Sequence, residues 1–589
     1  MRRTCLFLVV FAAVCRGFAA QPSEAAVLPL DELKPGQAGE VWTVFKGTEP
    51  EPFAVEITGV LRNALGPGKS LIVCELTDPR VQKMGAVAGM SGSPLYVGGR
   101  LAGALSYQIQ RFETVRFAGF TPAADLSEVR DRLSGTGGQT VVSAPASADS
   151  TYKAIQPVFT LGGLSPLVAD LFAPHFAALG LSTIALGGST QGSIAPQPAT
   201  AELQTQNSKL RTAGLRPGGA VAVALATGDI TLAGTGTVSR VDGPNITAFG
   251  HPMMSLGDVE LPMCAAEILT ILPSQMSSMK IANTGAVIGT ITQDRLSAVS
   301  GTLGAGPDMT NVDVTVKTGR GAARTLRFAV VRQQQLTPLI VAAGVSQAIL
   351  GSNDAGLVNG FRLSSNVSFP AAQKLASQTL YAGPQGFTQG LNEFVQGLAA
   401  NLQNPYAKTF PDQVSFTIEP LKDNPAVTLD MFQLSRSTPR AGQLVQLTIA
   451  WRDWQGGAHR EIIDIPIDSS WAGKQLEVVM APGRAMDELT GRPRVISASE
   501  LRSFEAYLAA MRDDRPTDGV CIAVVERAAL FSDQTVATPD APGSIERIAR
   551  ASDEARFRRR EAMLPLWEKH ILTGKLLNGV VRRPMNVVE

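Results

Sequence analysis

Residues 89–105 of the sequence read GMSGSPLYVGGRLAGAL, a turn rich in glycine and serine followed by two short apolar runs. The dipeptide Gly98-Gly99 between those runs is typical of a β-hairpin turn. Ser91 lies on the tight bend before the hairpin, where glycines allow a backbone that projects a hydroxyl outward and aims neighbouring N–H groups at one point. The stretch predicts a rigid β unit that carries a serine nucleophile, although the same composition also suits a purely structural turn.

The β pattern continues on both sides of this stretch. From Val41 to Leu105 short apolar strands alternate with Gly/Pro turns, and a second β-rich unit begins near Pro217. In Leu444–Trp451 apolar and polar residues alternate with a period of two, which is typical of a half-buried strand. This last region has the size and pattern of an immunoglobulin-like β-sandwich. We therefore expect a mainly β protein.

A chain of 589 residues is too long for one core and indicates three or four domains of about 150 residues each. The pattern divides it into a signal peptide (1–19), a Ser-bearing β domain (28–145), a connecting segment with some helix (146–212), a second β domain (213–369), a helical linker (370–412), an immunoglobulin-like β-sandwich (413–535) and a charged helical tail (536–589). The tail is predicted from its charged residues, Glu546, Arg547, Arg550, Arg556, Arg558, Arg559 and Arg560.

The N-terminus has the three regions of a secretory signal peptide. Arg2 and Arg3 precede the apolar run Leu6–Val14, and small residues follow, with cleavage expected near Ala19 or Ala20. The apolar run is too short to span a bilayer as an anchor, and no later segment reaches about 18 apolar residues. We expect an exported protein, periplasmic or secreted, with no transmembrane segment in the mature chain.

The composition gives little support to cofactor, metal or nucleic-acid chemistry. A net charge of +1 offers no electrostatic case for nucleic acid or a membrane surface. The sequence contains no Cys-x-x-Cys, His-Glu-x-x-His or phosphate-loop motif, and its four histidines are scattered. After removal of the signal peptide, Cys74, Cys264 and Cys521 form no disulfide framework. Cys74 is interpreted as a buried, inert thiol, with a Cys74–Cys264 bridge as the alternative.

A serine nucleophile needs a base, and the histidines are the candidates. His175 lies in an apolar run, and His459 and His570 have contexts that surface placement explains. His251 differs because it ends a predicted strand in Ala248-Phe249-Gly250-His251-Pro252, where a turn positions its side chain on a scaffold.

Two separated segments carry a family resemblance. Leu76-Thr77-Asp78-Pro79, with Ser91 thirteen residues after Asp78, resembles the serine half of the SpoIVB family of signalling peptidases. The segment from Gly236-Thr237-Val238 to Phe249-Gly250-His251, and later Gly285–Gly289, is similar to the histidine half of that family. The resemblance covers roughly Val27 to Gly306.

The resemblance implies a fold of two trypsin-like β-barrel halves, Ser-bearing and then His-bearing, the reverse of the family's order. It implies Ser91 as nucleophile, His251 as general base and Asp78 as the acidic third residue. By analogy with chymotrypsin-type enzymes, the N–H groups of Gly89 and Ser91 would form the oxyanion hole. Asp229 and Asp258 remain rival carboxylates for orienting His251.

The function expected from these observations is that of an exported serine endopeptidase that acts on a protein or peptide through an acyl-enzyme, without cofactor or metal. One alternative is a non-catalytic binding or assembly protein of the cell envelope that presents the C-terminal sandwich to an envelope partner. A second is an esterase that uses the same nucleophile.

Overall fold

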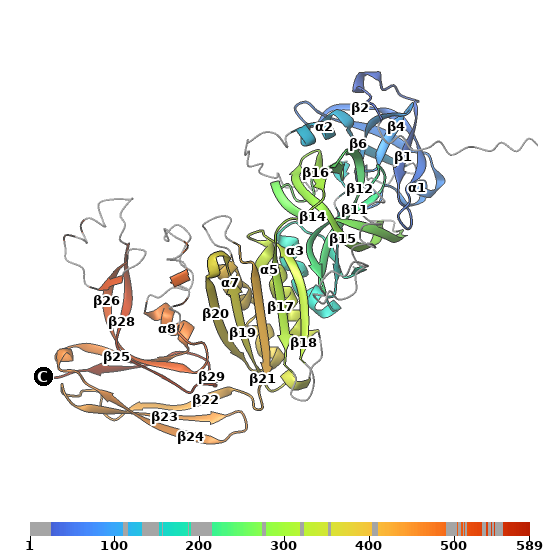
Figure 1. Cartoon of the computed structure of the whole chain (residues 1–589). Helices are drawn as coiled ribbons and strands as arrows, with labels where there is room; N and C mark the ends of the chain where they lie inside the picture. Colours follow the sequence, from blue (N-terminus) through green and yellow to red (C-terminus); the bar gives the residue numbers. More distant parts are fainter. Residues whose placement is uncertain are drawn as a thin grey trace, which may run out of the picture.

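The computed structural model describes residues 25–109, 116–131, 152–155, 157–186, 188–189, 215–273, 278–317, 323–351, 355–402, 410–490, 504, 508–509, 512, 515–532, 537–539, 544, 547 and 558–589. The predicted signal peptide lies outside these residues. The protein is mainly β, as expected. Figure 1 shows three groups of elements: strands coloured blue to green, yellow strands with their helices, and orange to red strands near the C-terminus.

The first group begins with a closed six-stranded barrel. Its strands are β1 (Ala38–Thr43), β2 (Glu51–Gly66), β3 (Lys69–Leu76), β4 (Pro94–Val97), β5 (Arg100–Ile109) and β6 (Phe117–Pro122). They pair in the order β4-β1-β2-β3-β6-β5, and β5 closes the ring by pairing with β4 across the predicted hairpin turn at Gly98-Gly99. Alternate residues such as Phe53, Val55 and Ile57 point into the core. Two helices, α1 (Pro79–Met84) and α2 (Ala123–Asp131), and the short strand β7 (Tyr152–Ala154) complete this unit.

A second ring of six strands follows. Its members are β11 (Ala220–Gly228), β12 (Thr231–Asp242), β13 (Asn245–Ala248), β14 (Gly257–Leu272), β15 (Met279–Arg295) and β16 (Ala298–Leu303). They pair in the order β11-β14-β15-β16-β13-β12, and β12 pairs with β11 to close the ring. Around it lie β8 (Phe159–Gly162), β9 (Thr183–Ile184), β10 (Gly188–Ser189) and α3 (Pro166–Ala178). The helix α3 lies in the connecting segment where the sequence predicts some helix.

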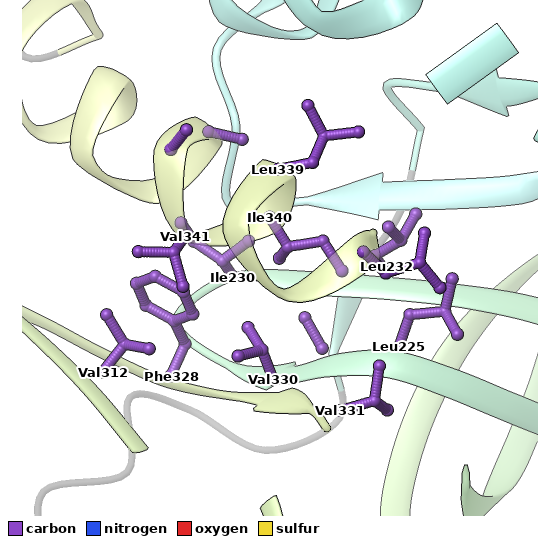
Figure 2. Close-up of a cluster of buried hydrophobic side chains, with 14 of the residues drawn as sticks. Leu225, Ile230, Leu232, Val312, Phe328, Val330, Val331, Leu339, Ile340 and Val341 are labelled. Atoms are coloured by element: carbon purple, nitrogen blue, oxygen red, sulfur yellow. The ribbon is translucent and has the colours of Figure 1, made fainter. Parts of the chain in front are cut away.

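The sheet of the second ring continues into a layer covered by helices. β11 pairs with β18 (Arg324–Val331), and the order continues through β17 (Met309–Val316), β21 (Gln413–Pro420), β19 (Phe361–Ser368) and β20 (Lys374–Tyr381). The helices are α5 (Leu336–Leu350), α6 (Gly383–Gln389) and α7 (Leu391–Leu402). Figure 2 shows Leu339, Ile340 and Val341 of α5 gathered with Phe328 and Val330 of β18 in the buried core.

The predicted helical linker, residues 370–412, is only partly helical. Helices α6 and α7 occupy Gly383–Leu402, but Lys374–Tyr381 forms β20 and pairs with β19 along its full length. Strand β21, which the sequence assigns to the start of the sandwich, pairs instead with β17 and β19. Pairing partners distant in the sequence override the local helical pattern here, because a strand's preference depends on its neighbours in the sheet.

The C-terminal part contains two sheets with a common core. The first consists of β22 (Ala426–Leu434), β23 (Leu444–Asp453), β24 (Ala458–Pro466) and β29 (Leu576–Leu577). The second consists of β25 (Gln475–Ala481), β26 (Val520–Ser532), β27 (Ala537–Pro539), β28 (Arg558–Ile571) and β30 (Val581–Asn586), with α8 (Gly483–Leu489) beside it. Val445, Leu447 and Ile449, predicted to alternate into a core, are fully buried there. An immunoglobulin-like topology stays a prediction.

The predicted charged helical tail is wrong over its last part. Arg558, Arg559 and Arg560 begin β28, which pairs with β26 as far as Ile571. The charges alone suggested a solvated helix, but apolar residues follow them, and two of these, Met563 and Ile571, are buried in the strand. Arg547 is helical, while Glu546, Arg550 and Arg556 lie outside the described residues.

Two further findings concern the membrane and the thiols. None of the helices in the described part of the chain is long and apolar enough to cross a membrane. Cys74, Cys264 and Cys521 are buried free thiols, so the Cys74–Cys264 bridge is absent.

Candidate active site

The turn that carries Ser91 is held by hydrogen bonds within itself. The N–H of Met90 donates to the carbonyl of Val87 at 2.9 Å, and both the N–H and the Oγ of Ser93 donate to the carbonyl of Met90. Gly89 and Gly92 have φ values of 95° and 94°, a conformation that favours glycine. The local sequence therefore encodes much of the bend.

Strand β12 of the second ring holds the same turn from outside. The N–H of Thr237 donates to the carbonyl of Ser91 at 2.8 Å, and its Oγ1 donates to the carbonyl of Gly89 at 3.0 Å. The Oγ of Ser239 donates to the carbonyl of Gly92 at 2.8 Å. A Cβ atom added at Gly92 would lie 2.0 Å from the carbonyl oxygen of Thr237, so only glycine allows this approach. The two rings therefore meet at Ser91.

The turn that carries His251 follows β13 and contacts the first barrel. Phe249 and Gly250 both have positive φ, 70° and 67°, and the N–H of Phe249 donates to the carbonyl of Thr237. The Oγ1 of Thr121 in β6 donates to the carbonyl of Gly250 at 2.7 Å. A Cβ atom added at Gly92 would lie only 2.5 Å from the nitrogen of Phe249, which puts the Ser91 turn directly against the His251 turn.

Ser91 and His251 are both fully buried, and both present an unpaired polar atom. In the part of the chain that the structure describes, neither the Oγ of Ser91 nor the Nε2 of His251 has a hydrogen-bond partner. Leaving such an atom unpaired costs about 1–3 kcal/mol. Unsatisfied groups of this kind are rare in native proteins and require an explanation, of which a catalytic role is one.

The imidazole of His251 is neutral at neutral pH and has a defined tautomer. Burial lowers its pKa to about 4, although the carbonyls of Pro252 and Ile155 favour the charged form. Its Nδ1 lies 2.7 Å from the carbonyl oxygen of Pro252. Because a carbonyl only accepts, Nδ1 carries the proton, which leaves a lone pair on Nε2. This is the form that can act as a base.

No hydrogen bond within the described residues joins Asp78 to His251. Asp78 caps α1, and its carboxylate accepts from the backbone N–H of Arg80 at 2.8 Å and from the guanidinium of Arg80. Partial burial raises its pKa, but the hydrogen bonds and charge of Arg80 outweigh burial and hold the pKa below the ordinary value. The hydrogen-bond acceptor at Nδ1 of His251 is the carbonyl of Pro252 and not a carboxylate.

The rival carboxylates also have other partners. Asp229 accepts from the N–H of Arg327, and Asp258 accepts from Gln293 and Arg295. Among the described residues, no hydrogen bond joins either carboxylate to His251.

Asp294, which sequence reasoning missed, holds the loop after His251. This buried carboxylate of β15 accepts from the N–H groups of Met253, Met254 and Leu256 at 2.7, 2.8 and 3.2 Å. Burial raises its pKa, and these N–H groups act in the opposite direction. A charged residue inside a strand, in the run Ile291–Arg295, is the only local signal, because the loop that it holds lies about 40 residues earlier.

Lys280 was also missed. Its side chain is buried behind the Ser91 turn, with its Cβ 3.0 Å from the position of a Cβ added at Gly89, and its Nζ donates to the Oγ1 of Thr43 at 2.8 Å. Burial lowers its pKa to about 7. The backbone N–H of Lys280 donates to the carbonyl of Ala88 at 2.9 Å. Lys280 thus joins β15 of the second ring to the first barrel.

The backbone N–H groups of the turn fall into two sets. Those of Met90, Gly92 and Ser93 donate to carbonyls, whereas within the described residues those of Gly89 and Ser91 have no acceptor. These are the two donors predicted for an oxyanion hole. The described residues contain no cluster of His, Cys, Asp and Glu that could hold a metal ion.

The family model described as SpoIVB peptidase S55 matches residues 16–112, which include Asp78, Gly89 and Ser91 but not His251. No curated protein and no solved structure matches the chain. The match supports the SpoIVB-type serine peptidase resemblance over residues 16–112, the part of the chain that carries Ser91.

Proposed function

We propose that this protein is a serine endopeptidase with Ser91 as nucleophile and His251 as general base. The observation that carries the proposal is the contact of the two turns, which buries an unpaired Ser91 Oγ and an unpaired His251 Nε2 in adjacent turns. The two closed rings of six strands that meet there support the trypsin-like arrangement implied by the family resemblance, with the halves in reverse order. Chain order does not hinder catalysis, since the same constellation occurs in several orders.

The chemistry follows from the tautomer of His251. The Oγ of Ser91 attacks the peptide carbonyl while Nε2 of His251 takes its proton. His251 then gives that proton to the leaving amine, and an acyl-enzyme on Ser91 remains. Water, deprotonated by His251, hydrolyses the ester and restores the free hydroxyl. A substrate must first gain access to the site, because Ser91 and His251 are buried in this structure.

The oxyanion formed in each step would be stabilised by the free N–H groups of Gly89 and Ser91. Such donors lower the barrier because they already point at the developing charge, and removal of one typically costs a factor of about 100 to 1000 in rate. Lys280 packs against Gly89 from behind and supports this turn.

The third member of the site would be a backbone carbonyl. The carbonyl of Pro252 fixes the tautomer of His251, the task that a carboxylate performs in a Ser-His-Asp triad. Asp294 anchors the loop that contains this carbonyl through three N–H groups. Asp78 is therefore proposed as a helix cap and not as the orienting residue.

The cellular setting extends the proposal. The N-terminal pattern of residues 1–19 supports export to the periplasm or beyond, and the peptidase family implies a protein substrate. A role of the C-terminal sheets in binding an envelope partner is a further hypothesis, and a non-catalytic envelope protein is the rival function.

Irreversible labelling with a fluorophosphonate tests the proposal. Over several hours even a site that opens rarely accumulates label, and we expect one label per chain, on Ser91. The variants Ser91→Ala and His251→Ala should not label. Ser93→Ala is the matched control, because its hydroxyl is committed to the carbonyl of Met90. Labelling that persists in Ser91→Ala would move the nucleophile elsewhere.

A further inference from the structure

A short strand of the chain itself lies beside the two turns. β7 pairs antiparallel with β5, with Ala154 opposite Tyr107 and Lys153 opposite Gln108. The pairing continues past the end of β7, because the N–H of Ile155 donates to the carbonyl of Ser106 at 2.8 Å. β5 belongs to the hairpin that follows Ser91, so this added strand runs along the edge of the nucleophile's own hairpin.

Ser106 links this strand to the His251 turn. Its Cβ lies 3.4 Å from the position of a Cβ added at Gly250. Its Oγ lies 2.8 Å from the Oγ1 of Thr121, whose hydroxyl donates to the carbonyl of Gly250. The carbonyl of Ile155 acts on the ring of His251. Ile155 is therefore joined to β5 through its N–H, and Ser106, the residue that it pairs with, contacts the turn of the proposed base.

The side chain of Ile155 is only 2% exposed and packs in the apolar core of the first barrel. Lys153, by contrast, is exposed. The strand thus inserts one aliphatic side chain beside the site and leaves its preceding lysine in solvent. An extended peptide that adds to a sheet edge binds in the same manner, through main-chain hydrogen bonds with a pocket for selected side chains.

We infer that Tyr152–Ile155 occupies the position of the substrate and keeps the peptidase inhibited, and that the substrate is an extended peptide with an aliphatic residue at the position of Ile155. This inference rests on the proposed function. It accounts for the full burial of Ser91 and His251, which a substrate could not reach in this structure.

The position of Tyr152–Ile155 is that of an inhibitor and not that of a peptide about to be cleaved. A scissile carbonyl must enter the oxyanion hole, but the N–H groups of Gly89 and Ser91 hold no acceptor within the described residues. The carbonyl of Ile155 instead favours the charged form of His251. Displacement of a strand of three paired residues would open the site without unfolding either ring.

The test compares labelling rates of the full chain. In Lys153→Pro the proline breaks the pairing of β7 with β5, and Lys153→Thr is the matched control because threonine suits a strand. We expect the fluorophosphonate to label Lys153→Pro at least about ten times faster than the wild type, and Lys153→Thr at the wild-type rate. The peptide acetyl-Tyr-Lys-Ala-Ile-amide should slow labelling of Lys153→Pro in a concentration-dependent way.

A second variant tests the inference independently, in case Lys153→Pro misfolds. Ile155→Ala keeps the backbone but loses the buried side chain, and it should also label faster than the wild type, with an unchanged circular dichroism spectrum. Equal labelling rates in the wild type and both folded variants would overturn the inference and leave the proposed function standing. Absence of label in every variant, under conditions that label a control serine hydrolase, would overturn the proposed function and the inference with it.

Discussion

The Ser91 turn and the His251 turn both contain residues with positive φ, yet they are held in different ways. The Ser91 turn closes on itself through Met90 and Ser93, and strand β12 only adds to it. The loop after His251 depends on Asp294, which lies about 40 residues further along the chain. The proposed nucleophile is thus held largely by a local turn, whereas the loop after the proposed base is anchored by a buried carboxylate from a distant strand.

The largest effect should come from the contact between the turns. Gly92→Ala places a Cβ atom 2.0 Å from the carbonyl oxygen of Thr237 at a φ of 94°. The left-handed conformation costs about 1–2 kcal/mol and the clash about as much again or more, so we expect a loss of about 4 kcal/mol and no fluorophosphonate labelling. Urea unfolding and labelling measure the two effects.

The matched control for this change is Gly98→Ala. Gly98 also has positive φ, 56°, but nothing lies within 4 Å of an added Cβ. The free energy of unfolding of Gly98→Ala should fall by only about 1–2 kcal/mol, and the variant should be labelled at the wild-type rate. Similar losses in both variants would show that the two rings do not press together at Gly92.

The anchor of the His251 loop comes next. Asp294→Asn replaces an acceptor of three N–H groups by a group that also donates, and we expect a loss of about 3 kcal/mol and labelling slower by about 10 to 100 times. If Asp294 positions His251, the labelling rate of Asp294→Asn at saturating fluorophosphonate should fall, while the affinity for the initial binding of the reagent should stay unchanged. Asp258→Asn, on an exposed carboxylate of β14, is the control. A variant that is destabilised but reacts at the wild-type rate would reduce Asp294 to a structural residue.

The pH dependence of stability should report the burial of His251. Its pKa is about 4 in the folded protein and about 6.5 in the unfolded chain, so the unfolded chain binds a proton more readily between these values. The contribution of His251 to stability is complete above about pH 6.5 and is lost as the pH falls to about 4, by up to about 3 kcal/mol.

Denaturant unfolding from pH 4 to pH 7 measures this dependence. The part due to His251 should disappear in His251→Gln and persist in His459→Gln, where an exposed histidine of β24 is replaced. An unchanged slope in His251→Gln would mean that the imidazole is solvated in the folded protein.

The smallest effect is expected at Asp78. Asp78 is a helix cap whose side chain is bound by Arg80, so Asp78→Ala should lower the free energy of unfolding by about 1 kcal/mol. The labelling rate should stay within about threefold of the wild-type rate. An orienting carboxylate would instead cost a factor of about 10000. Such a loss in Asp78→Ala, with the fold intact, would restore Asp78 as the third residue.

Predictions from the sequence succeeded where the signal is local. The hairpin at Gly98-Gly99 forms as predicted, the residues Val445, Leu447 and Ile449 alternate into a core, and the family resemblance at Ser91 is matched by the family model. They failed where pairing partners decide. The local pattern favours a helix over β20, which pairs with β19, and β28 begins with a charged run but pairs with β26. The roles of Ser91, His251 and Gly89 stay predictions until they are tested.

The local sequence determined the turns around Gly89, Gly92 and His251 and the hairpin, because a turn depends mainly on the residues within it. Tertiary structure decided everything that needs distant partners: the contact of Gly92 with Thr237, the anchoring of the His251 loop by Asp294, the burial of Lys280 behind Gly89 and the strand at Ile155. The spacing of residues in the sequence does not predict these contacts. Each joins groups that are far apart along the chain, and separation along the chain has no fixed relation to distance in the fold.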